Sequence, residues 1–297
     1  MTQHRACFDF RIAFTNGGTL AGAGFRLDLP GPEATRAEVS ELLIHDLGLT
    51  MVGSVELTSL RLVEEAHRGT RRTTAGTAAR RCVELSHAIS HGMTTYPGLP
   101  GPEITEHLTR EAAEAVYGPG VRFQIGRISM VANTGTYLDS PFHRFDDGAD
   151  LAAVALDRLA ALDGVVVRVA GSDRRAIDVA ELAPYDVCRR AVLIHTGWER
   201  HWRTPGYGVD APYLTREATA WLVDQGAALV GIDSVNIDDM GDRTRPVHTG
   251  LLGAGIPIVE HLCGLDQLPV TGFSFHASPP RIERFGTFPV RAYAVIG

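Results

Sequence analysis

One polar segment, residues 130–150, constrains this chain more than any other part of its sequence. It follows RFQIGRISMV, whose β-branched and aromatic residues are typical of a strand. Side chains alternate between the two faces of a strand, so Asn133, Tyr137 and Asp139 are expected to share one face. Gly135 would leave room in this row for a metal, a water or a substrate. Three polar side chains on one face near a sheet edge predict a functional site.

The same segment ends with a proline and a histidine. Pro141 has no backbone N–H to donate, so it ends the strand and places His143 on the loop that follows. A carboxylate such as Asp139 or Glu260 would orient His143 as a general base or acid. Tyr137 and Asn133 would then donate hydrogen bonds to a developing oxyanion or enolate. Such a set suits proton transfer next to a carbonyl, cyclisation, dehydration, or hydrolysis by an activated water.

Residues 133–143 resemble the signature of the cyclase family, which includes bacterial kynurenine formamidases and isatin hydrolases and reads His-x-Gly-Thr-His-x-Asp-x-Pro-x-His. The matching positions are Gly135, Thr136, Asp139, Pro141 and His143. The resemblance extends from about Val83 to the C-terminus, through LIHTGWERHW, GIDSVNID, HTGLLGAGIPIVEHL and FGTFPVRAYAVIG. It implies an α/β fold, the family's swivelling β/β/α arrangement, and hydrolysis of an amide, lactam or similar bond with zinc or manganese.

The chain departs from the signature at two metal ligands. Asn133 and Tyr137 stand where the family has metal-binding histidines. A neutral amide is a weak ligand, and a phenol binds only when deprotonated, so the two-metal centre of kynurenine formamidases is not expected. By resemblance, His248 and Glu260, twelve positions later (260 − 248), join Asp139 around a metal. Two versions of the site remain: one divalent ion (zinc or manganese) held by Asp139, His248 and Glu260, or acid–base catalysis without a metal.

A Gly- and Pro-rich loop at 91–102 borders the substrate pocket in the family. Tyr96 and Pro97 match its aromatic-Pro-Gly pattern, and Tyr96 suits packing beneath the loop as well as a wall for the substrate. Phe142, inside the signature, is a third candidate for substrate contact.

The order of elements predicts two domains joined by a linker. Residues 1–66 read as a small α+β domain of unknown role: Asn16-Gly17 marks a hairpin, and Thr35 with Glu38 forms a capping box before a helix. Residues 67–81 are rich in Arg, Thr, Ala and Gly and read as a linker. Residues 82–297 form the catalytic domain.

Within this domain, helices and strands alternate, which implies an α/β sheet. Helices are predicted at 109–116, 150–160, 176–183 and 215–226. Strands are predicted at 83–90, 164–170, 190–198 and 228–238, and a short helix followed by a strand at 248–260.

Composition excludes several classes of partner. Hydrophobic residues make up 44% of the 297 residues and charged residues 21%, as in globular proteins with a sizeable core. A net charge of −7 gives no support for nucleic acid as partner. No apolar run is long enough to cross a bilayer and no secretion signal is present, so a cytoplasmic protein is expected. Four scattered cysteines without a CxxC pair argue against a zinc knuckle and a disulfide framework.

The leading hypothesis is therefore a cyclase-family enzyme acting on a small carbonyl compound, as hydrolase of an amide, lactam or lactone or as a biosynthetic cyclase. The alternative is an inactive binding or scaffold protein. Retention of His143, Asp139, His248 and Glu260 together favours the enzyme. The resemblance further implies a homodimer or larger assembly.

Overall fold

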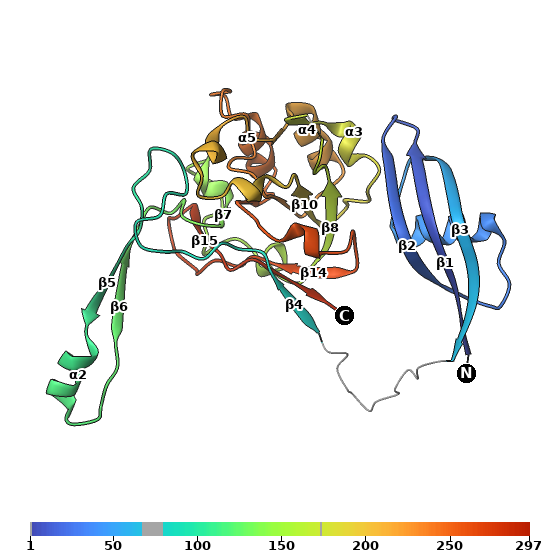
Figure 1. Ribbon diagram of the computed structural model, residues 1–297. Coiled ribbons are helices and arrows are strands. Elements are labelled where there is room, and N and C mark those ends of the chain that lie inside the picture. Colours follow the sequence, from blue (N-terminus) through green and yellow to red (C-terminus); the bar gives the residue numbers. More distant parts are fainter. Residues whose placement is uncertain (1, 67–79, 173) are drawn as a thin grey trace.

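A mixed sheet of nine strands forms the centre of the computed structural model, which describes residues 2–66, 80–172 and 174–297 (Figure 1). In order across the sheet, the strands are β15 (Thr287–Pro289), β7 (Tyr137–Asp139), β13 (Ile258–Glu260), β12 (Leu229–Ile232), β10 (Ala191–His195), β8 (Leu162–Arg168), β14 (Phe273–His276), β16 (Tyr293–Ile296) and β4 (Arg81–Glu84). The four strands from β13 to β8 run parallel, and antiparallel strands flank them on both sides. The predicted α/β class is confirmed.

Three helices lie together on one side of this sheet (Figure 1). They are α3 (Val179–Leu182), α4 (Arg216–Asp224) and α5 (Pro246–Gly253). Thr215 caps α4 by accepting the backbone N–H of Ala218, and Pro246 occupies the first turn of α5, where a missing N–H costs no hydrogen bond. The central strands β8, β10 and β12 are almost wholly buried, because helices and loops cover both faces.

The N-terminal residues form a separate three-stranded antiparallel sheet in the order β2-β1-β3 (Figure 1). Its elements are β1 (Thr2–Phe14), β2 (Thr19–Leu29), α1 (Arg36–Asp46) and β3 (Val52–Ala66). The predicted hairpin and capping box are present, and Thr35 and Glu38 satisfy each other's backbone N–H groups. A single long strand occupies the segment after the helix.

The small sheet packs its apolar face against the large domain. Phe8, Phe10 and Ile12 belong to the same hydrophobic cluster as Val165 and Leu182 of the large domain. Backbone hydrogen bonds also join the two parts, including the one from the Thr50 N–H to the Pro184 carbonyl (2.9 Å) and the one from the Asp186 N–H to the Gly48 carbonyl (3.2 Å).

Because the two parts share one hydrophobic core, the contacts of the N-terminal sheet indicate that it stabilises the large domain. The division into 1–66 and 82–297 stays a prediction. The expected linker, 67–81, lies outside the described residues except at its last two positions.

A two-stranded arm extends away from the large domain (Figure 1). It consists of β5 (Glu103–Leu108), α2 (Arg110–Tyr117) and β6 (Ile125–Ser129). Seven of its large apolar side chains are exposed: Ile104, Val116, Tyr117, Val121, Phe123, Ile125 and Ile128. Two short strands, β9 (Ala176–Ile177) and β11 (Tyr213–Leu214), pair beside α3 and α4.

Three predicted elements are corrected. Residues 150–160 form turns and one 3₁₀ turn at Leu156–Arg158 instead of a helix, because the Asp150 carboxylate binds backbone N–H groups nearby and that of Arg284. The strand expected at 228–238 ends at Ile232. Polar residues after it bind loop backbones instead of continuing the ladder.

The third correction concerns the signature. Strand β7 begins only at Tyr137, because Gly135 adopts the left-handed conformation with φ +67°. A Cβ at Gly135 would lie 3.1 Å from a side-chain carbon of Ile89. The room expected beside Gly135 is therefore filled by Ile89, and Asn133 does not share a strand with Tyr137 and Asp139.

Within the described part of the chain, no helix has both the length and the apolar character needed to cross a membrane.

Candidate active site

The site is built where β7 and β13 pair. Asp139 lies opposite Ile258 and Tyr137 opposite Glu260, so alternate residues of both strands point to the same side. Asp139 is fully buried. Its Oδ1 accepts a hydrogen bond from the Thr287 hydroxyl, whereas its Oδ2 has no hydrogen-bond partner. A buried carboxylate oxygen without a partner carries a large desolvation cost, so it marks a place for a ligand.

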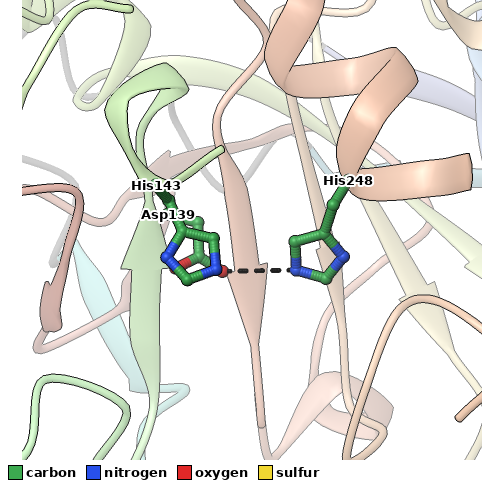
Figure 2. A group of neighbouring side chains, drawn as sticks. All are labelled: Asp139, His143 and His248. Atoms are coloured by element: carbon green, nitrogen blue, oxygen red, sulfur yellow. Dashed lines mark ion pairs between the residues drawn. The ribbon is translucent and has the colours of Figure 1, made fainter. Parts of the chain in front are cut away.

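His143 stands beside Asp139 at the end of the 3₁₀ turn Pro141–His143, with its side chain 32% exposed (Figure 2). Its Nδ1 is 2.7 Å from the Thr287 hydroxyl and 3.6 Å from Asp139 Oδ1. Because Thr287 has one hydroxyl proton and donates it to Asp139, it accepts from His143 Nδ1–H. This assignment leaves Nε2 of a neutral His143 free to bind an ion or take a proton.

His248 reaches the site from α5 and faces Asp139 (Figure 2). Its Nδ1 binds the Asp238 carboxylate, which also accepts the N–H of Val247 at the start of the helix. Its Nε2 lies 3.6 Å from Asp139 Oδ2 and 3.8 Å from Glu260 Oε1. Burial opposes the charged imidazolium, but the Asp139 and Asp238 carboxylates outweigh it and raise the pKa of His248 to about 10.

The same charges act in reverse on Asp139. Burial disfavours its ionised form, but the neighbouring His248 and His143 imidazoles and the Thr287 hydroxyl outweigh burial and lower its pKa. Asp139 is therefore a carboxylate at neutral pH.

Ligand atoms of Asp139, His143 and His248 all lie within 4.8 Å of one another, which fits one metal ion. Two imidazole nitrogens and one carboxylate oxygen are ligands that zinc and manganese accept. Asp238 orients His248 as an outer-shell carboxylate orients a metal-binding histidine. The partnerless Oδ2 of Asp139 supplies the remaining evidence of fit.

This group differs from the predicted set of Asp139, His248 and Glu260. Both oxygens of Glu260 are already used: Oε2 accepts the Tyr137 hydroxyl and Oε1 accepts the Ile237 N–H, each at 2.7 Å. Burial raises the pKa of Glu260, the His248 charge lowers it, and Asp139 raises it, with an upward result. His143 takes the third place in the group because the 3₁₀ turn brings it back over Asp139.

Tyr137 lies on the far side of Glu260 in a neutral hydrogen-bond network. It is 1% exposed, and its hydroxyl oxygen is 3.2 Å from His261 Nε2. His261 Nδ1 is in turn 2.8 Å from the Tyr207 hydroxyl. Burial, then Glu260 and Asp139, raise the pKa of Tyr137 well above its usual value, while a hydrogen bond with Asn133 lowers it.

Protons can be assigned throughout this network. Burial and His87 lower the pKa of His261 to about 3, so its ring is neutral. Tyr207 donates to His261 Nδ1, His261 Nε2–H donates to Tyr137, and Tyr137 donates to Glu260. The Tyr137 proton is thus committed to Glu260 and not presented to a substrate, contrary to the oxyanion role expected for it.

The three predicted substrate contacts occupy different places. Pro97 lines a cavity of about 590 Å³, while Tyr96 packs against the aromatic cluster around Tyr207. Phe142 is half-buried next to His143.

Sequence reasoning missed Asp238, His261, Tyr207 and Thr287. Only His261 carried a signal, because it directly follows Glu260 at the end of a strand.

Comparisons with known proteins agree with this fold. The Cyclase family profile matches residues 83–239, which is more than half of the chain. Kynurenine formamidase from Erythrobacter litoralis is 27% identical over 209 residues, covering 68% of this chain and 88% of the relative. Kynurenine formamidase from Geobacillus thermodenitrificans is 30% identical over 170 residues, covering 57% and 78%. Isatin hydrolase A from Ralstonia solanacearum superposes with a TM-score of 0.62 at 21% identity, covering 73% of this chain and 92% of that one.

The fold and the signature together define a class of α/β enzymes with a polar site at the edge of a mixed sheet. The chain belongs to the cyclase family. The predicted family membership is thereby confirmed.

Proposed function

We propose that this protein is a hydrolase that cleaves the C–N bond of a small amide or lactam with one divalent ion held by Asp139, His143 and His248. The observation that carries the proposal is the buried Oδ2 of Asp139, which accepts no hydrogen bond and lies 3.6 Å from His248 Nε2. The relatives named kynurenine formamidase and isatin hydrolase support amide-type substrates.

When bound, the ion would polarise the substrate carbonyl and lower the pKa of a water molecule. The chain's own residues prepare the site for this chemistry. Thr287 holds Asp139 and His143 in one orientation through its single hydroxyl, and Asp238 fixes His248 so that Nε2 points at Asp139. Glu260 is held in place by two donors, so its carboxyl group keeps a fixed position beside the site.

A second version, without a metal, rests on the contact of His143 with Thr287 and Asp139. In this version His143 Nε2 takes a proton from water or substrate, and Asp139 stabilises the imidazolium through Thr287 and by its own charge, with Nδ1 3.6 Å away. A biosynthetic cyclisation would need the same proton transfer. Elemental analysis and activity in chelator separate the two versions.

The test is a screen of formanilides, cyclic amides and lactones with protein purified from metal-replete medium. We expect about one equivalent of zinc or manganese per chain and turnover that chelator abolishes. His143→Ala should lose turnover, and His107→Ala, an exposed histidine on the arm, serves as control. Undiminished activity in chelator would favour the metal-free version. No turnover on any class by folded protein would favour the alternative, an inactive binding or scaffold protein.

The expected homodimer or larger assembly and the cytoplasmic location stay predictions. The exposed apolar residues of the arm support self-association, because a two-stranded sheet is marginally stable when both faces are solvated. Light scattering at micromolar concentration measures the assembly directly.

A further inference from the structure

A cavity of about 590 Å³ lies between residues 90–97 and 203–208, outside the group of Asp139, His143 and His248. Cavities of this size hold small organic ligands. Met93, Pro97 and Tyr207 give it apolar walls, and Met93 and Tyr207 are themselves buried. We call this cavity the Arg203 groove, after its principal cation.

The walls of the groove touch the signature segment. The Thr95 hydroxyl in the groove accepts the backbone N–H of Gly135 at 2.8 Å. Tyr207, on another wall, donates to His261, which contacts Tyr137. A ligand in the groove would therefore lie against residues that position the candidate active site.

Arg203 brings a positive charge that no acidic side chain offsets. Its guanidinium donates to the Ser90 hydroxyl and lies 3.4 Å from the Met93 sulfur, both neutral groups. Among the described residues no carboxylate lies within 4.0 Å of Arg203, and the groove lining contains no Asp or Glu. The charge reaches the neighbouring His87, whose pKa burial and then Arg203 lower to about 4.

The backbone also holds Arg203 in an unusual way. Its φ is +62°, in the left-handed region, which a residue with a Cβ adopts only at a cost in conformational energy. The surrounding loop keeps this backbone conformation, and the contacts with Ser90 and Met93 place the guanidinium at the groove.

We propose that the Arg203 groove binds a small molecule that bears a carboxylate on an apolar, planar body, with the carboxylate paired to Arg203 and the body against Met93, Pro97 and Tyr207. A guanidinium matches a carboxylate with two parallel N–H donors, which an ammonium cannot do. Because the groove adjoins the signature segment, this molecule is the substrate or the acid end of it. That step rests on the proposed function, while binding to the groove does not.

The binding test uses benzoate and benzamide, which have the same ring but differ in charge. Titrations followed by calorimetry and by tryptophan fluorescence are suitable, since Trp202 precedes Arg203. We expect Arg203→Met to weaken benzoate about tenfold or more and to leave benzamide unchanged, with Arg203→Lys between. Arg200→Met is the matched control, because Arg200 binds the Gly197 carbonyl beside Trp198 and does not line the groove.

Equal affinity of the wild type for benzoate and benzamide would overturn the proposal, and so would benzoate binding that Arg203→Met and Arg203→Lys leave intact. Thermal melts of all variants verify folding, and the lysine variant supplies the measurement if the methionine variant is unstable.

The kinetic test compares a formanilide with the same compound carrying an ortho carboxylate. We expect Arg203→Met to raise KM for the acid about tenfold with little change in kcat, and to spare the neutral compound. His143→Ala should lower turnover of both about a hundredfold or more while keeping benzoate affinity. If benzoate binding depends on Arg203 but the protein turns over no substrate, only the proposed function is contradicted. If turnover depends on His143 but does not change in Arg203→Met, only the role of the groove in substrate binding is contradicted.

Discussion

Two buried histidines of this protein, His248 and His261, have the same side chain and opposite chemistry. His248 is 3% exposed and its pKa rises to about 10, whereas His261 is fully buried and its pKa falls to about 3. Burial lowers both values, so the difference comes from their partners. Asp139, Asp238 and Glu260 surround His248, while the hydroxyls of Tyr207 and Tyr137 bind His261.

The comparison divides the site into a charged half and a neutral half. In the charged half, around His248, carboxylates outnumber imidazoles and one carboxylate oxygen accepts no hydrogen bond, which leaves room for a metal ligand contact. In the neutral half, the protons of Tyr207, His261 and Tyr137 each have an acceptor. Glu260 stands at the boundary, since it accepts from Tyr137 and faces His248 at 3.8 Å.

The largest expected effect is on turnover in the charged half. His143→Ala should lower kcat/KM about a hundredfold to ten-thousandfold, because it removes both an ion ligand and the only signature histidine at the open side of the site. The measurement is steady-state kinetics on the best substrate of the screen. Near-normal turnover by folded His143→Ala would place the chemistry elsewhere in the chain.

The second prediction adds metal ligands to the neutral half of the site. In Asn133→His/Tyr137→His, two imidazoles replace the amide and the phenol, and imidazole is a stronger neutral ligand than either. We expect the metal content to rise from about one to about two equivalents per chain. Elemental analysis after gel filtration measures it. Tyr207→His, which alters the same network away from Asp139, should keep the wild-type content; an unchanged content in the folded double variant would contradict the prediction.

The third prediction concerns the carboxylate behind His248. Asp238→Asn keeps the shape of the side chain and removes its charge, so His248 loses basicity and a fixed orientation. Such outer-shell changes typically weaken metal binding by about tenfold to a hundredfold. Competition with a fluorescent chelator measures the affinity. Asp242→Asn, at a half-buried aspartate of the following turn, is the control and should bind the metal as the wild type does.

The sequence predicted those parts of the fold and of the site that depend on neighbouring residues in the chain. The capping box at Thr35, and the helix and strand that carry His248 and Glu260, follow from spacing and composition alone. The signature located Asp139 and His143. The contact of His261 with Tyr137 was out of reach, because it joins residues 124 positions apart and depends on the register of β7 against β13. The sequence also could not predict that His143, and not Glu260, completes the ion group, because residue types do not give the distances between side chains.

The fourth prediction separates the halves by pH in metal-free protein. The folded pKa of His261 lies below its unfolded value near 6.5, so His261 contributes stability that is present above pH 6.5 and lost as pH falls toward 3. The folded pKa of His248 lies above the same reference, so His248 contributes stability that is present below pH 6.5 and lost as pH rises toward 10.

Each slope approaches about 1.4 kcal/mol per pH unit within its window. Urea unfolding across pH in chelator measures both. His261→Gln should flatten the acid side and His248→Gln the alkaline side. A reversed pattern would show that the partners assigned to the two rings are wrong.

The smallest expected effect tests the neutral half itself. Tyr137→Phe removes the donor to Glu260 Oε2 and the acceptor of His261 Nε2–H, leaving a buried carboxylate oxygen and a buried N–H unpaired. An unsatisfied buried group costs about 1–3 kcal/mol, and more when it is charged, so the free energy of unfolding should fall by that order. Tyr207→Phe leaves only the neutral Nδ1 of His261 without its donor and should cost less. Chemical denaturation of both variants and of their double variant measures the difference. If Tyr207→Phe costs as much as Tyr137→Phe, the charge on Glu260 does not set the value of the Tyr137 hydrogen bond, and the boundary between the halves lies elsewhere.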